Sequence, residues 1–79
     1  MTNKLTPNPT NGVFKVILDK DITAGSLMVK DVSWNTVYKT SFKDQKDIEV
    51  DIHSQNQGIY IVRVTSDKNE TYSEKLIKK

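Results

Sequence analysis

Hydrophobic residues recur at every second position along most of this chain. Successive side chains of a β-strand point to opposite faces, so a strand with one buried face gives this period. The pattern therefore predicts strands near residues 13–18, 26–32, 47–52, 58–66 and 70–78, and no helix. The apolar positions that alternate are Phe14, Val16 and Leu18; Leu27 and Val29; Ile48, Val50 and Ile52; Tyr60, Val62 and Val64; Tyr72 and Leu76.

Two more strands are predicted from less regular patterns. A short one is expected at Lys4 to Thr6, and another at 36–43. In the second segment Val37 has the opposite parity to Tyr38 and Phe42. A β-bulge adds one residue to a strand and so reconciles such positions. We therefore expect a bulge within residues 36–43.

Turn-forming residues separate the predicted strands. The intervening segments LDKDITAG, SWN, FKDQKD, SQNQG and SDKNE are rich in Asp, Asn, Gly and Ser, which bond the local backbone or tolerate positive φ. About seven short antiparallel strands with frequent turns are typical of an immunoglobulin-like β-sandwich. With 79 residues, the chain fits a single all-β domain over 1–79, whose core is small because such domains bury only about 60% of their unfolded surface.

Two segments carry more specific local predictions. In PNPTNG, residues 8–11 suit a type I turn with Pro9 at its second position, and Gly12 can then adopt positive φ. In GIYIVRV, Gly58 lets the chain turn into a strand. Tyr60 lies near the start of that strand, where sandwich domains often place a tyrosine whose hydroxyl binds an upstream backbone group.

Charge and composition exclude several classes of protein. The net charge is +2, and Lys and Arg are interspersed with Asp and Glu, so the single-sign block typical of a nucleic-acid-binding arm is absent. No apolar run approaches the roughly 18 residues of a membrane-spanning helix, and the N-terminus lacks the pattern of an export signal peptide. There is no cysteine, which excludes disulfides and thiolate metal sites. We expect no nucleic-acid partner.

The residues that could carry chemistry are few. His53 is the single histidine, so a histidine metal cluster is excluded and we expect a surface histidine. A calcium site at Asp19 and Asp21 is conceivable, but two oxygens fall well short of the six to eight that calcium takes. Asp47, Glu49 and Asp51 alternate with apolar residues and so form a solvent face. Phosphate-binding loops and nucleophile elbows are absent, so we expect no enzymatic activity, no metal and no cofactor.

The aromatic residues leave two explanations open. Exposed rings could form a platform for stacking sugars, or the rings could fill the core of a domain that has little else to fill it. Trp34 lies in a predicted turn and is the best candidate for exposure. A carbohydrate-binding or surface-binding module therefore remains the alternative function. The aromatic residues considered are Trp34, Tyr38, Phe42, Tyr60 and Tyr72.

The chain ends in KLIKK, which places Leu76 and Ile77 between lysines. The lysines could protect an edge strand against unwanted pairing. The strand could instead offer its unpaired backbone groups to a partner strand, which is β-augmentation. Such an edge would also permit self-association. The second explanation requires that the terminal strand be an accessible edge.

Four motifs carry a resemblance to a known family. They are TPNPTNG at 6–12, VKDVSWNTV at 29–37, VDIHSQNQGIYIVRV at 50–64 and EKLIKK at 74–79. In order and spacing they resemble the type A C-terminal sorting domain of the type IX secretion system. The ending is similar to that of the KLIKK proteases, which are secreted by a Bacteroidetes lineage. The residues that match the family's structural motif are Pro7, Asn8, Pro9, Asn11, Gly12, Asp51, Gly58 and Tyr60.

The resemblance implies that the domain is a secretion signal with an immunoglobulin-like fold. It implies a cargo protein, such as a protease, preceding Met1, and a precursor that passes through the periplasm. Translocon components at the outer membrane would recognise the folded domain, and a sortase-like signal peptidase would remove it. The cargo would then be at the outer membrane, on the cell surface or secreted. The implied recognition residues are Lys75, Leu76, Ile77, Lys78 and Lys79.

The chain departs from the family at one turn that matters below. The family usually has Gly where Trp34 stands. Because Asn tolerates the left-handed conformation better than most residues, we expect Asn35 to adopt positive φ in place of that Gly.

Overall fold

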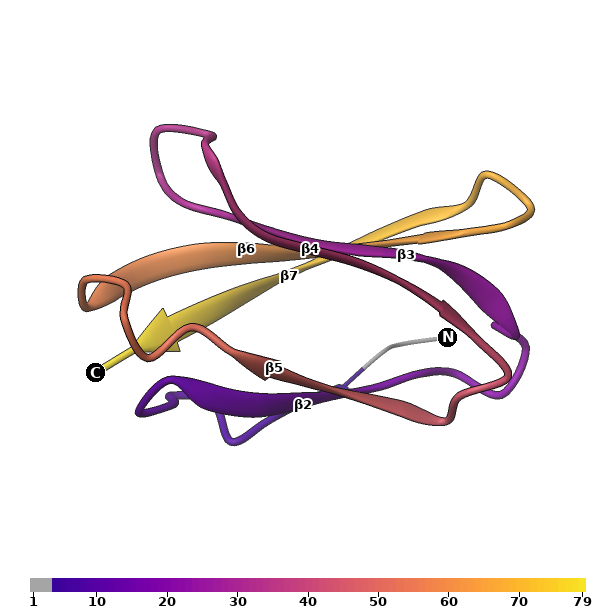
Figure 1. Ribbon diagram of the computed structural model, residues 1–79, viewed down its shortest axis with the longest axis horizontal. Coiled ribbons are helices and arrows are strands. Elements are labelled where there is room, and N and C mark those ends of the chain that lie inside the picture. The colour runs from indigo at the N-terminus through magenta and orange to yellow at the C-terminus, as the bar shows by residue number, and fades with distance from the viewer. Residues whose placement is uncertain (1–3) are drawn as a thin grey trace.

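The fold is an all-β sandwich, in a computed structural model that describes residues 4–79. Its seven strands are antiparallel, and the described chain contains no helix. They form a three-stranded sheet in the order β1-β2-β5 and a four-stranded sheet in the order β4-β3-β6-β7 (Figure 1). The predicted fold class is confirmed. The strands are β1 (Lys4–Thr6), β2 (Val13–Ile17), β3 (Ala24–Lys30), β4 (Thr36–Lys43), β5 (Asp47–Asp51), β6 (Gly58–Ser66) and β7 (Thr71–Lys78).

The core lies between the two sheets and consists of the inward members of the alternation. Tyr72 belongs to the predicted alternation but is only half-buried, and it packs against this core. Ile22 is buried as well, although it lies in the connection between β2 and β3 and outside any alternating run. Full burial of one such side chain stabilises the fold by about 1.5–3 kcal/mol. The buried members are Phe14, Val16, Leu18, Ile22, Leu27, Val29, Phe42, Ile48, Val50, Ile52, Tyr60, Val62, Val64 and Leu76.

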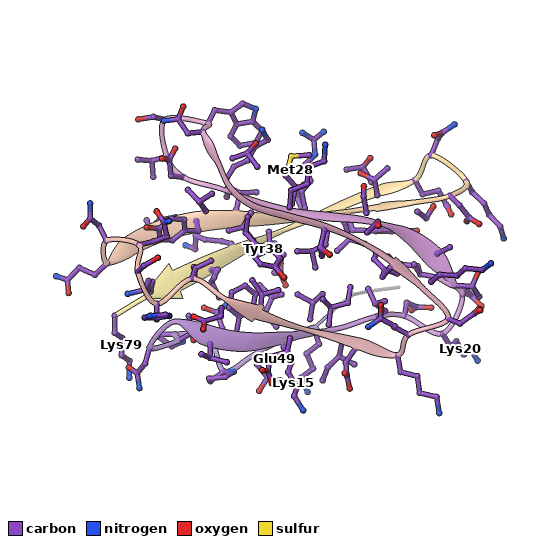
Figure 2. All side chains as sticks on the ribbon, in the orientation of Figure 1. Lys15, Lys20, Met28, Tyr38, Glu49 and Lys79 are labelled. Atoms are coloured by element: carbon purple, nitrogen blue, oxygen red, sulfur yellow. The ribbon has the colours of Figure 1, made fainter. Side chains whose placement is uncertain are left out.

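The predicted bulge lies in β4. Val29 pairs with Tyr38, but the next residue, Lys30, pairs with Thr36, so Val37 is the extra residue. This shift turns Tyr38 toward the interior, where it packs against the core (Figure 2). The prediction from opposite parities is confirmed.

The hairpin between β3 and β4 corrects one prediction. Trp34, not Asn35, has the positive φ, at 68°. The amide of Trp34 donates to the carbonyl of Asp31 at 2.9 Å, and the amide of Asp31 donates to the carbonyl of Asn35 at 3.0 Å. A short hairpin loop closed in this way needs a left-handed residue directly after its turn. That position falls on Trp34, so the loop geometry overrides the preference of Asn.

The carboxylate of Asp31 organises the same loop. It accepts hydrogen bonds from the amides of Ser33 and Asn35, both at 2.9 Å. The bond from the Asn35 amide is the main reason why the pKa of Asp31 lies below its ordinary value of 3.8. An ionised Asp31 therefore holds the loop that presents Trp34.

The predicted tyrosine contact is confirmed near the start of β6. The Tyr60 hydroxyl donates to the carbonyl of Asn56 at 2.5 Å. Burial, followed by the negative charge of Asp31, raises the pKa of Tyr60. Gly58, where the chain enters β6, has a positive φ of 148°. This contact fixes the loop that leads into the strand beside the C-terminus.

The PNPTNG segment is only partly as predicted. Gly12 has a positive φ of 135°, as expected. A Cβ atom at Gly12 would lie 2.6 Å from the Cα of His53, so only glycine fits there. Among the described residues no backbone hydrogen bond from Asn11 to Asn8 closes a turn over 8–11, and the amide of Thr10 donates to the distant carbonyl of Ile77 at 2.8 Å.

Candidate functional site

The C-terminal strand β7 lies at one edge of the four-stranded sheet (Figure 1). It pairs with β6 along its whole length, from Thr65 with Thr71 to Gly58 with Lys78. This pairing divides the KLIKK tail into two faces. Leu76 is fully buried and Lys78 is 8% exposed, whereas Lys75, Ile77 and Lys79 are exposed.

The outer edge of β7 is covered over the tail. The amide of Thr10 donates to the Ile77 carbonyl and the amide of Lys79 donates to the Thr10 carbonyl, both at 2.8 Å. The side chain of Asn8 adds two bonds: its Nδ2 donates to the Lys75 carbonyl at 2.9 Å, and its Oδ1 accepts from the Ile77 amide at 3.0 Å. We call Asn8 and Thr10 the clasp. The clasp satisfies backbone groups that an edge strand usually leaves unpaired.

Thr10 is itself firmly held. It is 1% exposed, and its hydroxyl donates to the carbonyl of Val13 at 2.8 Å and accepts from the amide of Gly12 at 3.1 Å. Because a buried polar group costs free energy unless it is hydrogen-bonded, these bonds make burial of Thr10 favourable. They also tie the clasp to the start of β2.

The strand ends that carry the other motif residues lie where β7 ends: β5 also ends there, and β2 and β6 begin there (Figure 1). The Gly12 carbonyl accepts from the Ile52 amide at 2.7 Å. Gly58 pairs with Lys78, and Tyr60 pairs with the buried Leu76. Pro7, Pro9 and Asn11 are exposed on the segment that carries the clasp.

Asp51 closes the turn after β5. Its carboxylate accepts from the His53 amide at 2.9 Å and lies 2.6 Å from the Nδ1 atom of the same residue. The bond from the His53 amide is the main reason why the pKa of Asp51 lies below its ordinary value. The imidazole is 73% exposed, as predicted for a surface histidine.

The clasp corrects the expectation of an open backbone edge at the tail. Alternate residues of an antiparallel strand direct their backbone groups away from the partner strand. On β7 these include Lys75 and Ile77, which the clasp engages, and Thr71 and Ser73, with which no second strand of the described chain pairs. In this structure strand addition is therefore open at Thr71 and Ser73, whereas the tail presents side chains.

The remaining candidates do not assemble into a site. The Asp21 amide donates to the Asp19 carboxylate at 3.1 Å. Within residues 4–79, no group of three or more His, Asp or Glu side chains is arranged to hold a metal ion. Phe42 and Tyr60 are buried, and Trp34 is 54% exposed. Tyr38 and Tyr72 are half-buried, so the rings do not form the exposed strip expected of a sugar platform.

Sequence analysis missed two features of this surface. The first is the burial of Thr10, which nothing in its polar, proline-containing segment predicts. The second is the contact of Trp34 with Lys30 and Arg63, whose charged groups lie 5.4 and 5.9 Å from the ring centroid. Within the part of the chain that the structure describes, no helix is long and apolar enough to cross a membrane.

A family model matches nearly the whole chain. It describes a secretion system C-terminal sorting domain and covers residues 4–79. No curated protein matches the chain. The match spans the clasp, the tail and every strand in between. The chain therefore belongs to the family of type IX secretion system C-terminal sorting domains, which are signal modules without catalytic activity of their own.

Proposed function

We propose that the export machinery reads this domain through the outward side chains of its clasped tail. The observation that carries the proposal is the division of the tail into two faces. Leu76 is fully buried, and the clasp binds the backbone of Lys75, Ile77 and Lys79. The side chains of these three residues are what the tail offers to a partner.

The clasp supports this role because it fixes the tail before binding. Ordering one residue of flexible chain costs roughly 1–2 kcal/mol. Binding to a strand that is already ordered avoids this entropy loss. Ile77, at 40% exposed, supplies apolar contact. Exposed lysine pairs contribute only about 0.2–1 kcal/mol each, so Lys75 and Lys79 act mainly on encounter and orientation.

The finer steps rest on the family and on the ending of the chain. The domain directs an attached cargo from the periplasm across the outer membrane, and a sortase-like peptidase then removes it. The KLIKK ending supports a secreted protease of that group as the cargo. The cargo's final location is the outer membrane, the cell surface or the medium. Any self-association through β7 would use its open edge at Thr71 and Ser73.

The fold dictates how export should be tested. Deleting the last five residues would remove Leu76 from the core, and so would confound recognition with stability. Residues 1–79 should instead be fused to a periplasmic reporter in a bacterium with a type IX system. A Lys75→Gln, Ile77→Thr, Lys79→Gln variant changes exposed side chains and keeps a β-branched residue in the strand. We expect at least tenfold less exported reporter, about 1.4 kcal/mol of lost recognition, with unchanged thermal stability.

Two controls separate recognition from folding. A Lys4→Gln, Ile17→Thr, Lys15→Gln variant makes the same changes on the other sheet, where Ile17 is also 40% exposed; its export should equal that of the parent. Leu76→Ala should cost about 2–5 kcal/mol of stability while leaving the outward tail intact. If the tail variant and the matched control were exported to the same level, the proposal would be wrong.

A further inference from the structure

The outward face of the four-stranded sheet carries charge of one sign. Side chains alternate between core and solvent along each strand, and the charged residues at its outward strand positions are all basic: Lys30, Lys39, Lys43, Arg63 and Lys75. The outward face of the other sheet differs, since Lys15 there pairs with Glu49 (Figure 2). One side of the sandwich is therefore basic and the other is mixed.

The basic residues alternate with apolar ones across the sheet. Lys30 pairs with Ile61, which pairs with Lys75. In the next row Lys39 pairs with Met28, which pairs with Arg63. Both rows run cation, apolar, cation, and since neighbouring strands are about 4.8 Å apart, the cations of one row are separated by roughly 10 Å. We call these two rows and Trp34 the basic face.

Trp34 lies on this face and is held there by its cations. The Lys30 ammonium is 5.4 Å and the Arg63 guanidinium 5.9 Å from the ring centroid, within the range of cation–π attraction. The ring is nevertheless 54% exposed. Its backbone is left-handed, with φ at 68°, a conformation that bulky residues rarely adopt and that clusters at functional sites.

The cations around Trp34 form no close ion pair within the described residues, although the charge of Lys30 contributes to the lowered pKa of the neighbouring Asp31. Within residues 4–79, neither Lys30 nor Arg63 has a carboxylate at ion-pair distance. The one acidic residue of the nearby loop, Asp31, already accepts the amides of Ser33 and Asn35. An incoming carboxylate would therefore meet a guanidinium that can bind it through two parallel hydrogen bonds.

We propose that the basic face docks an acidic segment of a partner protein that also carries apolar side chains. Alternating cations and apolar groups match a polypeptide in which Asp or Glu alternates with apolar residues. A sugar chain would need more exposed rings than Trp34 alone. Met28 and Ile61, the apolar members of the two rows, are half-buried, so each row offers a shallow apolar contact between two cations, which suits the alternating side chains of an extended polypeptide. Lys75 belongs both to this face and to the tail, but docking is argued from Trp34, Lys30 and Arg63, which lie outside the tail.

The test uses the purified domain and a synthetic peptide in which Glu alternates with Val, measured by isothermal titration calorimetry. We expect binding that weakens as salt is added. Arg63→Glu should weaken it at least tenfold. Trp34→Gly should do so too, and φ at 68° suits glycine, so this variant keeps its fold. Lys15→Glu makes the same charge change on the other sheet and should leave the affinity within twofold of the parent.

Three comparisons can overturn the proposal. The counterpart peptide with Lys in place of Glu must not bind. Oligogalacturonate and phosphatidylglycerol vesicles present negative charge on a sugar and on a membrane, and if either bound while the Glu peptide did not, the occupant would be of another class. Failure of the Glu peptide to bind, or an equal loss in Lys15→Glu, would refute docking at this face. Cells and export play no part in the measurement, so its outcome is independent of the tail experiment.

Discussion

At the scale of single residues, Trp34 combines a cost with a compensation. The left-handed conformation costs an L-residue roughly 1–2 kcal/mol. Two exposed cation–π contacts, with Lys30 and Arg63, contribute about 0.5–1 kcal/mol each. The two effects are of similar size, so the indole stays on the sheet at little net expense in stability. Glycine would avoid the cost, but it would also leave the basic face without its ring.

This balance predicts an unusual order of stabilities. Trp34→Ala loses both cation–π contacts and keeps the strain, so its free energy of unfolding should be about 1–2 kcal/mol lower than that of the parent. Trp34→Gly also loses the contacts, but it relieves the strain. Part of this gain in stability is offset because glycine has more conformational entropy in the unfolded chain. We expect the glycine variant to be about 0.5–1 kcal/mol more stable than the alanine variant, measured by urea denaturation. An alanine variant as stable as the glycine variant would show that φ at this position carries no strain.

At the scale of elements, the strands were predictable because their signal is local. Each strand has its own alternation of buried and exposed positions, and the bulge in β4 showed in the opposite parities of Val37 and Tyr38. The predicted strand at 26–32 was placed two residues late, because Ala24 and Gly25 join the sheet without an apolar signal. The presence of a strand, and which of its residues face the core, thus follow from a few neighbouring residues.

The clasp was not predictable for the opposite reason. Asn8 and Ile77 are separated by 69 positions, and nothing in a stretch rich in Asn and Pro specifies a partner so distant. A local type I turn was the reasonable expectation for 8–11, but the chain satisfies the amide of Thr10 at the far end of the sequence. The accessibility of the tail, which decides how it is recognised, therefore had to come from the structure.

The clasp can be tested as an element by removing its side-chain contacts. Asn8→Ala deletes the bonds to the Lys75 carbonyl and the Ile77 amide. At a net 0.5–1.5 kcal/mol per hydrogen bond, and with both bonds exposed, we expect a loss of about 1–2 kcal/mol. Amide hydrogen exchange should accelerate at Ile77 more than at Val62 in the centre of β6. Asn11→Ala, an exposed neighbour, is the control and should change neither quantity; equal exchange at Ile77 in the two variants would mean that Asn8 does not secure the tail.

At the scale of the whole molecule, two loops respond to acid in the same direction. Asp31 and Asp51 both have a pKa below the ordinary value of 3.8, chiefly because backbone amides of Asn35 and His53 donate to them. A carboxylate with a lowered pKa in the folded state binds fewer protons there than in the unfolded chain. Its contribution to stability is complete above pH 3.8 and is lost as the pH falls through the lower, folded value.

The corresponding prediction concerns the slope of stability with pH. In the Asp31→Asn, Asp51→Asn variant, the amide oxygens can still accept hydrogen bonds but no longer titrate. The free energy of unfolding of this variant should fall less between pH 5 and pH 2 than that of the parent, as measured by urea denaturation at each pH. The pair Asp47→Asn, Glu49→Gln, on the exposed face of β5, serves as the control. An unchanged slope in the first variant would show that these two carboxylates do not govern acid sensitivity.

The position of the single tryptophan has a practical side. Its indole sits on the outside of the sandwich between two cations and away from the core, so intrinsic fluorescence excited at the indole band reports what approaches that surface. Melting of the interior will register more faithfully in the far-ultraviolet circular dichroism of the strands. The domain thus carries a native optical probe for ligands that is poorly suited to following its own unfolding.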